Sequence, residues 1–294
     1  VDLHRPYVDR VVLRCAHCGG EARRVPEVLD VWFDSGSMPY GQWHYPFENK
    51  ERVDSTFPAD FVGEALEQTR GWFYTLHVLA GVLTLDDLGL GTGQPAFRNA
   101  VASGLILAED GRKLSKSLQN YPDPSGLVAK YGADSIRLYL LSATKLGEDT
   151  RFSDRLVGEL CRRFTLILWN VWQYERTYGA ERETQDTDRE PPSALPLLDR
   201  WVLARTEKLV ADVRTAMDAY RPDDAARALL PFVDDLSTWY VRRSRGRTEA
   251  LPVLREVLRV FSVVAAPFIP FLAEHIHREL TGRSPHLADW PSDE

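Results

Sequence analysis

The sequence has 294 residues, of which 44% are hydrophobic and 27% are charged. This is enough to bury a sizeable core, and we expect two domains. The formal net charge of −7 excludes a uniformly basic nucleic-acid coat but leaves local basic patches open. No apolar run approaches the ~20 residues of a membrane span, and no signal-peptide pattern follows Val1. With only three cysteines, the composition indicates a cytoplasmic protein that has no membrane contact and no disulfide framework.

The two halves of the sequence differ in their hydrophobic periodicity. The first half mixes short β-type runs with one clear helix, whereas the second half is almost wholly helical. We therefore predict an α/β domain over residues 1–150, followed by an all-α helical bundle over residues 151–294. The first-half elements are strands at 11–14, 57–61 and 100–107 and a helix at 67–85, and the glycine-rich run 89–94 is read as a loop.

Four helices are predicted in the second half. The third has the clearest apolar stripe, which runs from Ala225 to Trp239 at spacings of three and four, and Pro222 stands at a helix-opening position. The acidic, proline-bearing stretch 181–193 is interpreted as a solvated linker. The predicted helices cover 155–178, 196–220, 222–243 and 251–280.

Cys15 and Cys18 form a C-x-x-C knuckle, a spacing at which two thiolates can hold one side of a tetrahedral zinc ion. No second pair follows, so this is half of a site. The alternative is two free, buried thiols. His17 is a candidate third ligand, but the favoured interpretation is a surface histidine beside the turn. His275 and His277 stand two apart on a predicted helix and point to nearly opposite sides, which favours ordinary helix residues over a metal site.

An apolar strand leads through an Asp-Gly turn into Lys113-Leu-Ser-Lys116-Ser117. Only six of the 36 basic residues are lysines, yet two of them lie within this loop. A compact, mobile ammonium suits a triphosphate that is held and then released, and the hydroxyls of Ser115 and Ser117 add donors. Taken alone, a basic, solvated hairpin tip explains the same pattern.

The loop resembles the Lys-Met-Ser-Lys-Ser element of class I aminoacyl-tRNA synthetases, with Leu114 in place of Met. The surrounding segments are similar to the isoleucyl-tRNA synthetase family over nearly the whole chain. They include DVWFDSGSMPYGQWHYPFEN (30–49), FPADFVGEALEQTRGWFYTL (57–76), KSLQNYPDP (116–124), DDLSTWYVRRSR (234–245), APFIPFLAE (266–274) and HLADWP (286–291).

The resemblance implies roles for individual residues. Glu64 and Gln68 match residues that contact the isoleucyl adenylate, and Glu67 stands where the family usually has Asp. Trp32 and Trp72 match the walls of the isoleucine pocket, although core packing would also explain a tryptophan in an apolar run. Lys116 and, more weakly, Lys113 match the cations that stabilise ATP during activation, with Ser115 and Ser117 beside them.

The resemblance also implies a mechanism and its partners. The isoleucine carboxylate attacks the α-phosphate of ATP, pyrophosphate leaves, and the acyl group moves to tRNA(Ile), with Mg²⁺ on the triphosphate and no protein nucleophile. Cys15 and Cys18 match half of a structural Zn²⁺ knuckle whose other half precedes Val1. The helical half would bind the anticodon arm, with Arg242, Arg243, Arg245 and Arg247 as the best local candidates. A solvated helix end explains those arginines equally well, and the loop after them is shorter than in the family.

Two family features are missing from this sequence: the His-Ile-Gly-His element and the editing domain. We therefore expect a monomeric piece of a longer ligase, comprising the second half of a Rossmann-like catalytic domain and the anticodon-binding domain, that is inactive alone. Two alternatives remain: a non-catalytic helical tRNA-binding module with a remnant synthetase core, or a valine-specific class I synthetase.

Overall fold

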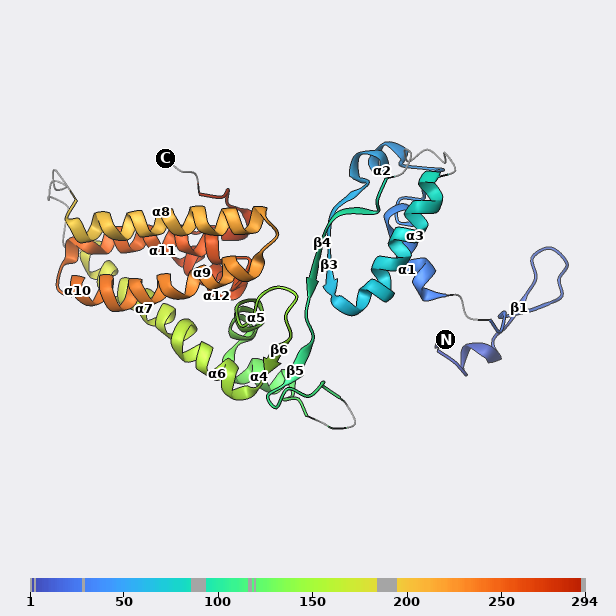
Figure 1. Cartoon of the computed structure of the whole chain (residues 1–294), viewed down its shortest axis with the longest axis horizontal. Helices are drawn as coiled ribbons and strands as arrows, with labels where there is room; N and C mark the ends of the chain where they lie inside the picture. Colours follow the sequence, from blue (N-terminus) through green and yellow to red (C-terminus); the bar gives the residue numbers. More distant parts are fainter. Residues whose placement is uncertain are drawn as a thin grey trace. The chain divides into compact units, whose positions relative to one another are not determined.

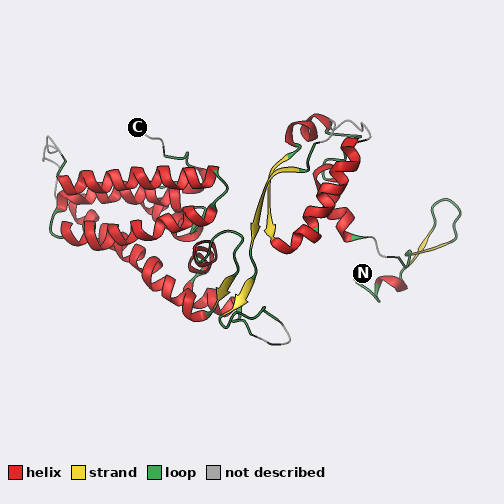
Figure 2. Ribbon diagram, viewed as in Figure 1, coloured by secondary structure: helices red, strands yellow, loops and turns green. Residues whose placement is uncertain are grey.

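The computed structural model shows a mixed α/β structure with many helices and, among the residues it describes, three small sheets (Figures 1 and 2). It describes residues 2, 4–27, 30–85, 94–115, 118, 120–183 and 195–291, with side chains in the α7 helix described to residue 179. These residues fall into two compact units. Unit 1 comprises Val1–Val62 and Glu67–Ala100, and unit 2 comprises Gly63–Leu66 and Val101–Glu294. Among the described helices, none combines the length and apolar character needed to cross a bilayer.

Unit 1 begins with a short 3₁₀ turn, η1 (Val8–Arg10), and an antiparallel hairpin of β1 (Val12–Arg14) and β2 (Glu21–Arg23). The chain continues through α1 (Val31–Gly41), α2 (Lys50–Thr56), β3 (Ala59–Ala65), the 3₁₀ turn η2 (Leu66–Arg70), α3 (Trp72–Leu85) and β4 (Phe97–Ser103), and β3 pairs with β4. Its small core contains Phe73 and Leu76 of α3 against Val62 of β3. Helices α1 and α3 approach closely at Gly36, where a Cβ would lie 2.9 Å from the Cβ of Thr75.

Unit 2 opens with the parallel pair β5 (Ile106–Ala108) and β6 (Thr150–Phe152), which are separated in sequence by α4 (Pro124–Tyr131) and α5 (Ala133–Ser142). Gly104 precedes β5 at a point of close backbone approach. A Cβ at this position would lie 2.2 Å from the carbonyl oxygen of Glu148, so only glycine fits.

The rest of unit 2 is helical, and its helices share one core. Asp123 accepts hydrogen bonds at the N-terminus of α4, and Ser153 does so at that of α6, as good N-caps do. Phe164, Trp172, Phe232 and Phe261 are among the largest fully buried side chains. The elements are α6 (Asp154–Leu160), the π-helical segment η3 (Cys161–Thr165), α7 (Leu166–Glu183), α8 (Leu197–Asp218), α9 (Pro222–Asp234), the π-helical segment η4 (Asp235–Val241), α10 (Arg242–Ser244), the 3₁₀ turn η5 (Thr248–Ala250), α11 (Leu251–Ala265), α12 (Pro270–Thr281) and the 3₁₀ turn η6 (Pro285–Leu287).

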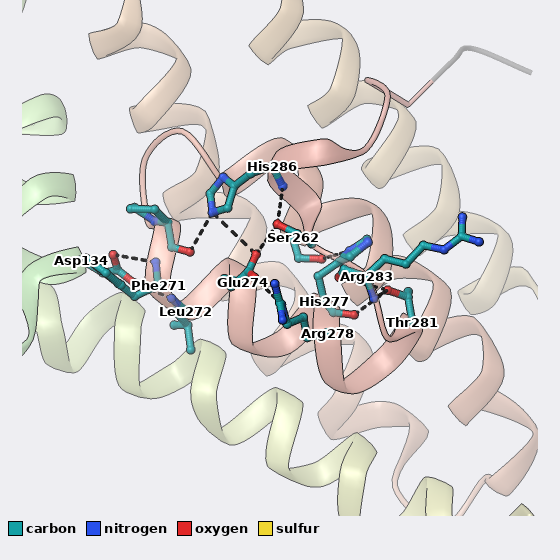
Figure 3. Close-up of polar contacts among 12 residues, drawn as sticks. Asp134, Ser262, Phe271, Leu272, Glu274, His277, Arg278, Thr281, Arg283 and His286 are labelled. Carbon is teal, nitrogen blue, oxygen red and sulfur yellow. Dashed lines mark hydrogen bonds and ion pairs between the residues drawn. The ribbon is translucent and has the colours of Figure 1, made fainter.

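Several polar contacts join α5 and the segment after it to the later helices of unit 2. Asp134 of α5 accepts hydrogen bonds from the backbone N–H groups of Phe271 and Leu272 (3.3 and 2.6 Å), so it caps α12 from a distant part of the sequence (Figure 3). Asp223 of α9 accepts a hydrogen bond from the N–H of Leu146, and Arg227 donates one to the carbonyl of Thr144. These contacts fix α5 and the segment after it to the helical core.

The structure differs from the predicted elements at several boundaries. The expected strand 100–107 is divided by Gly104 into β4 and β5, and the expected helix 67–85 starts as a 3₁₀ turn. The expected helix 251–280 is two helices, because Pro267 and Pro270 interrupt the backbone hydrogen bonding. The glycine-rich run lies almost wholly outside the described residues, as do residues 184–193 of the expected linker. The compact units divide near residue 100, since α4 and α5 pack with the later helices.

Candidate active and RNA-binding sites

Trp32, Gln68 and Trp72 lie together in unit 1. The Trp72 indole N–H donates to the carbonyl of Ser35 (3.0 Å), which fixes its ring against α1. The Gln68 side-chain oxygen accepts from the backbone N–H of Trp72 (2.8 Å), so it caps the start of α3. Trp32 stands in the first turn of α1, which is capped by Asp30. The result is a rigid cluster of two tryptophans and one amide.

Gly71 makes this arrangement possible. A Cβ on Gly71 would lie 2.6 Å from the Gln68 side-chain oxygen and 3.5 Å from the Cη2 atom of Trp32. Trp32 remains 45% exposed, so the cluster offers aromatic surface to a ligand as well as packing against its neighbours. Gly71 is therefore part of the candidate site, because any larger residue would displace Gln68.

Glu64 and Glu67 come shortly before Gln68 in the sequence. Glu64 is an exposed residue of β3, and Glu67 is an exposed residue of η2. Neither carboxylate has a hydrogen-bond partner among the described residues. Both groups are accessible to a ligand.

The lysine loop begins at a tight turn after β5. The carbonyl of Arg112 accepts from the N–H of Ala108 (2.8 Å), and Gly111 adopts the left-handed conformation with φ of 84° that the turn requires. Asp110 caps the turn by accepting from the Arg112 N–H. Lys113 then forms an antiparallel bridge with Leu107, so the first residue of the loop is tied to the strand. Lys116 and Ser117 lie outside the described residues.

Asn120 closes the loop from its far side. Its side-chain oxygen accepts from the N–H of Ser115 (2.9 Å), and its amide donates to the carbonyl of Lys113 (3.0 Å). One side chain thus holds the backbone on both sides of Leu114. Beside the loop, Glu109 accepts from the guanidinium of Arg155 in α6 (2.8 and 2.9 Å).

The cysteine knuckle lies in the loop between β1 and β2. The backbone N–H groups of Cys18 and His17 donate to the Cys15 sulfur and lower the pKa of its thiol, which favours the thiolate that a metal needs. Both thiols are free, and no third His, Cys, Asp or Glu joins them among the described residues. The donor set fits half of a tetrahedral zinc site.

The predicted arginine cluster divides into two environments. Arg242, Arg243 and Arg245 are exposed, and the Arg243 guanidinium lies 4.0 Å from the centroid of the Trp239 ring. Arg247 instead donates to Asp199 of α8 (2.6 Å), whose carboxylate is buried. Arg247 therefore holds the short loop after α10 against α8, so its predicted RNA contact would have to compete with this ion pair.

Sequence reasoning missed a small cavity beside these arginines. Its volume is about 390 Å³, and Tyr174 and Tyr178 of α7 line it together with Arg245, Arg247 and Thr248. The two tyrosine rings pack against each other with centroids 4.9 Å apart. Their spacing of four residues, which places both on one helix face, is the signal that could have found them. Ser35, Gly71 and Asn120 were also missed, because their roles depend on backbone contacts that no sequence pattern carries.

Comparison with known proteins identifies the family. Residues 2–153 match the family model of class I tRNA synthetases (I, L, M and V), and residues 199–294 match that of the anticodon-binding domain of tRNA ligases. The isoleucine–tRNA ligase of Treponema denticola is 42% identical and that of Thermus thermophilus is 45% identical, each over 99% of this chain. The chain spans only 28% and 29% of the length of these two relatives.

Solved structures support the fold. A ternary complex of an Agrobacterium radiobacter LeuRS with tRNA and LeuAMS superposes with a TM-score of 0.73 at 22% identity, covering 96% of this chain and 35% of that one. A Mycobacterium tuberculosis methionyl-tRNA synthetase with methionyl-adenylate superposes with a TM-score of 0.68 at 23% identity, covering 87% of this chain and 52% of that one. With a family model matched over more than half its length, the chain belongs to the class I tRNA synthetases.

Proposed function

We propose that this chain forms part of a ligase that joins isoleucine to tRNA(Ile) through an isoleucyl-adenylate intermediate. The observation that carries the proposal is the Trp32–Gln68–Trp72 cluster, found in a chain 45% identical to an isoleucine–tRNA ligase. Residues 1–150 would be the second half of the Rossmann-like catalytic domain, and residues 151–294 would be the helical anticodon-binding domain. The proposed protein is a cytoplasmic monomer.

Trp32 and Trp72 would form the apolar walls of the isoleucine pocket. Trp72 is held by Ser35, and Trp32 keeps part of its ring exposed, so the walls are preorganised and accessible. Glu64, Glu67 and Gln68 would bind the polar end of the adenylate. Isoleucine and valine differ by one methylene, and this pair is the standard example of how little one methylene supplies, roughly 10- to 200-fold in an apolar pocket.

The lysine loop would stabilise the triphosphate as the isoleucine carboxylate attacks the α-phosphate. Lys116 is the proposed principal cation and Lys113 its companion, with Ser115 and Ser117 as additional donors. The loop backbone at Lys113 and Ser115 is held by Asn120 and by the bridge to Leu107, which keeps the reorganisation cost of that part low when charge develops. Mg²⁺ would arrive on the ATP phosphates, as it usually does in nucleotide sites.

The helical part of unit 2 would bind the anticodon arm. The Tyr174–Tyr178 pair offers rings on which an unpaired base can stack, and Arg245 stands at the same cavity to meet a phosphate. Arg242 and Arg243 extend the basic surface. This combination of stacking rings and accessible arginines favours RNA over a small acidic metabolite.

Zn²⁺ would have a structural role at Cys15 and Cys18. Two thiolates supply two of the four ligands of a structural site, and the lowered pKa of Cys15 favours the ligating form. The remaining ligands would come from residues outside this chain.

The test is isoleucine-dependent exchange of pyrophosphate into ATP, measured on a polypeptide that contains this chain together with the segments that its longer relatives possess. We expect exchange with isoleucine at least tenfold faster than with valine. Lys116→Ala should slow exchange by several powers of ten while isoleucine binding changes little, because contacts made in the transition state appear in the rate. Faster exchange with valine would support the valine-specific alternative, and no exchange would support the non-catalytic module.

A further inference from the structure

We infer that a second stacking surface lies on the exposed face of unit 2, formed by Trp169 of α7 and His275 of α12, and that it receives an unpaired base of the bound RNA. The two rings are stacked, with centroids 5.6 Å apart and planes inclined by 21°. Trp169 is 37% exposed, and His275 is also exposed. The inference rests on the proposed tRNA-binding function and adds a contact separate from the tyrosine cavity.

The stack is rigid because a buried ring supports it from below. Trp172 is 1% exposed; its centroid lies 4.6 Å from that of Trp169 and 4.7 Å from that of His275, which it meets edge-on. Helix α12 is itself fixed at its N-terminus, where Asp134 caps Phe271 and Leu272 (Figure 3). The exposed surface therefore needs little ordering when a base stacks on it, which lowers the cost of binding.

The charges around the stack fit a polyanion. Three exposed arginines lie along η3 and α7, the helical segment that carries Trp169: Arg162, Arg163 and Arg176. None of them has an ion-pair partner among the described residues. This contrasts with Arg155 and Arg247, which are paired with carboxylates. Arg176 lies over the Trp172 ring at 5.4 Å and so stands beside the stack. On α12, Glu274 is neutralised by Arg278, and Glu279 is the nearby exposed carboxylate.

These features select an unpaired base over an apolar protein partner. A base presents a flat π-face to the exposed rings and a phosphate to the neighbouring arginines, and such stacking is tolerant of base identity. The stack and the tyrosine cavity share helix α7. Viewed along the helix axis, the sector of α7 between Trp169 and Tyr174 is partly exposed, and it carries Asn170, Gln173 and Thr177. One RNA segment could thus contact both edges of the helix.

The experiment measures the affinity of the 294-residue chain for a labelled tRNA(Ile) transcript by fluorescence anisotropy at several salt concentrations. Trp169→Ala should weaken binding about 5- to 150-fold, the range expected for one stacked base. Trp169→Phe should restore most of the affinity, because it keeps a ring on the same support. Arg162→Gln should reduce the slope of log Kd against log salt by roughly 0.7, the value for one single-strand phosphate contact.

Matched controls separate the contact from general effects. Leu287→Ala removes another exposed apolar side chain of unit 2, and Arg214→Gln removes an exposed arginine of α8; both should leave Kd within about twofold of the unaltered chain. Circular dichroism melting curves verify that the Trp169 variants are folded.

The outcomes distinguish this inference from the proposed function. Binding that Tyr174→Ala and Arg245→Gln weaken, but Trp169→Ala leaves unchanged, would overturn the second stacking surface alone and would leave this face for a protein partner. Absence of any tRNA binding by the unaltered chain would overturn both. Equal loss in Trp169→Ala and Trp169→Phe, with both variants folded, would also contradict stacking.

Discussion

Replacing Asp199 tests whether the arginine loop depends on a single buried carboxylate. Asp199 is 1% exposed; it accepts from the hydroxyl of Tyr240 (2.9 Å) and from the guanidinium of Arg247 (2.6 Å). Tyr240 is equally buried, and burial, followed by the negative charge of Asp199, raises the pKa of its hydroxyl. The carboxylate thus joins α8, η4 and the loop after α10 at one point.

The expected loss of unfolding free energy follows from the kind of contact that each substitution removes. Asp199→Asn keeps the volume but leaves one acceptor oxygen where two donors converge, so one contact loses its charge and the other loses its acceptor, at about 1 kcal/mol each. We therefore expect unit 2 to lose about 2 kcal/mol of unfolding free energy. Arg247→Gln leaves the carboxylate buried without its cation, and the cost of breaking a buried pair in this way is about 3–5 kcal/mol. Because Arg247 is itself 31% exposed, we expect the lower end of that range.

The assay is urea denaturation followed by far-ultraviolet circular dichroism, which reports mainly on the helices of unit 2. Asp212→Asn is the matched control on the same helix, because its exposed pair with Lys208 should contribute less than about 0.5 kcal/mol. The double variant of Asp199 and Arg247 should cost clearly less than the sum of the single variants, since both remove one interaction. Fully additive costs, or an Asp199→Asn variant as stable as Asp212→Asn, would refute the coupling.

Three further predictions concern the other sites. In the polypeptide used for pyrophosphate exchange, Gly71→Ala should raise the KM for isoleucine at least tenfold and leave the KM for ATP unchanged, because the new Cβ displaces Gln68. Gly81→Ala is the control and should be neutral, since a Cβ at that position meets open space. Equal effects of the two substitutions would contradict this prediction. Burial alone would raise the pKa of Asp223, but the hydrogen bonds from Arg227 and Leu146 outweigh it and the pKa is lowered. Ionised Asp223 therefore stabilises the folded state above about pH 4, the pKa of the carboxyl in the unfolded chain, and this stabilisation is lost as the pH falls through the lower pKa of the folded state. Thermal melts of Asp223→Asn at acid pH should lack this loss. The same fall in melting temperature with acid in Asp223→Asn and in the unaltered chain would disprove the assignment. A chelator should remove zinc from the 294-residue chain, as measured by elemental analysis, because Cys15 and Cys18 supply only two of the four ligands of a tetrahedral site. Stoichiometric zinc that resists the chelator would point to a local ligand such as His17.

The sequence predicted the mixed α/β class and most helices because their signals are local. The stripe from Ala225 to Trp239 and the opening Pro222 correspond to α9 and its π-helical continuation. The expectation that His275 and His277 lie in different environments agrees with the structure, since His275 stacks on Trp169 and His277 is buried against Ser262. A helix fixes such directions from its period alone.

The missed features depend on contacts between residues far apart in sequence. The strand 100–107 is broken because the backbone of Glu148 occupies the space beside Gly104. Arg247 has the same local sequence context as its neighbours, yet a carboxylate 48 residues away makes it an ion-pair partner. In the same way, the bond from the Trp72 indole to the carbonyl of Ser35, 37 residues away, fixes the orientation of that ring. No periodicity or motif encodes these pairings.

A single helical rod in unit 2 connects the lysine-loop region with the proposed RNA surface. Arg155 near its start contacts Glu109 beside the lysine loop, and Tyr174 lies 19 residues further on, about 28 Å away at the rise of an α-helix. The π-helical segment between them contributes buried Cys161 and Phe164 to the core and is therefore well packed. The Arg155–Glu109 contact is exposed and individually weak. Such a rod is packed along its length and can hold two sites at a constant spacing, whereas a conformational relay requires an element with two discrete packed arrangements. We therefore expect RNA bound at α7 to act on the lysine loop through fixed placement rather than through a conformational relay.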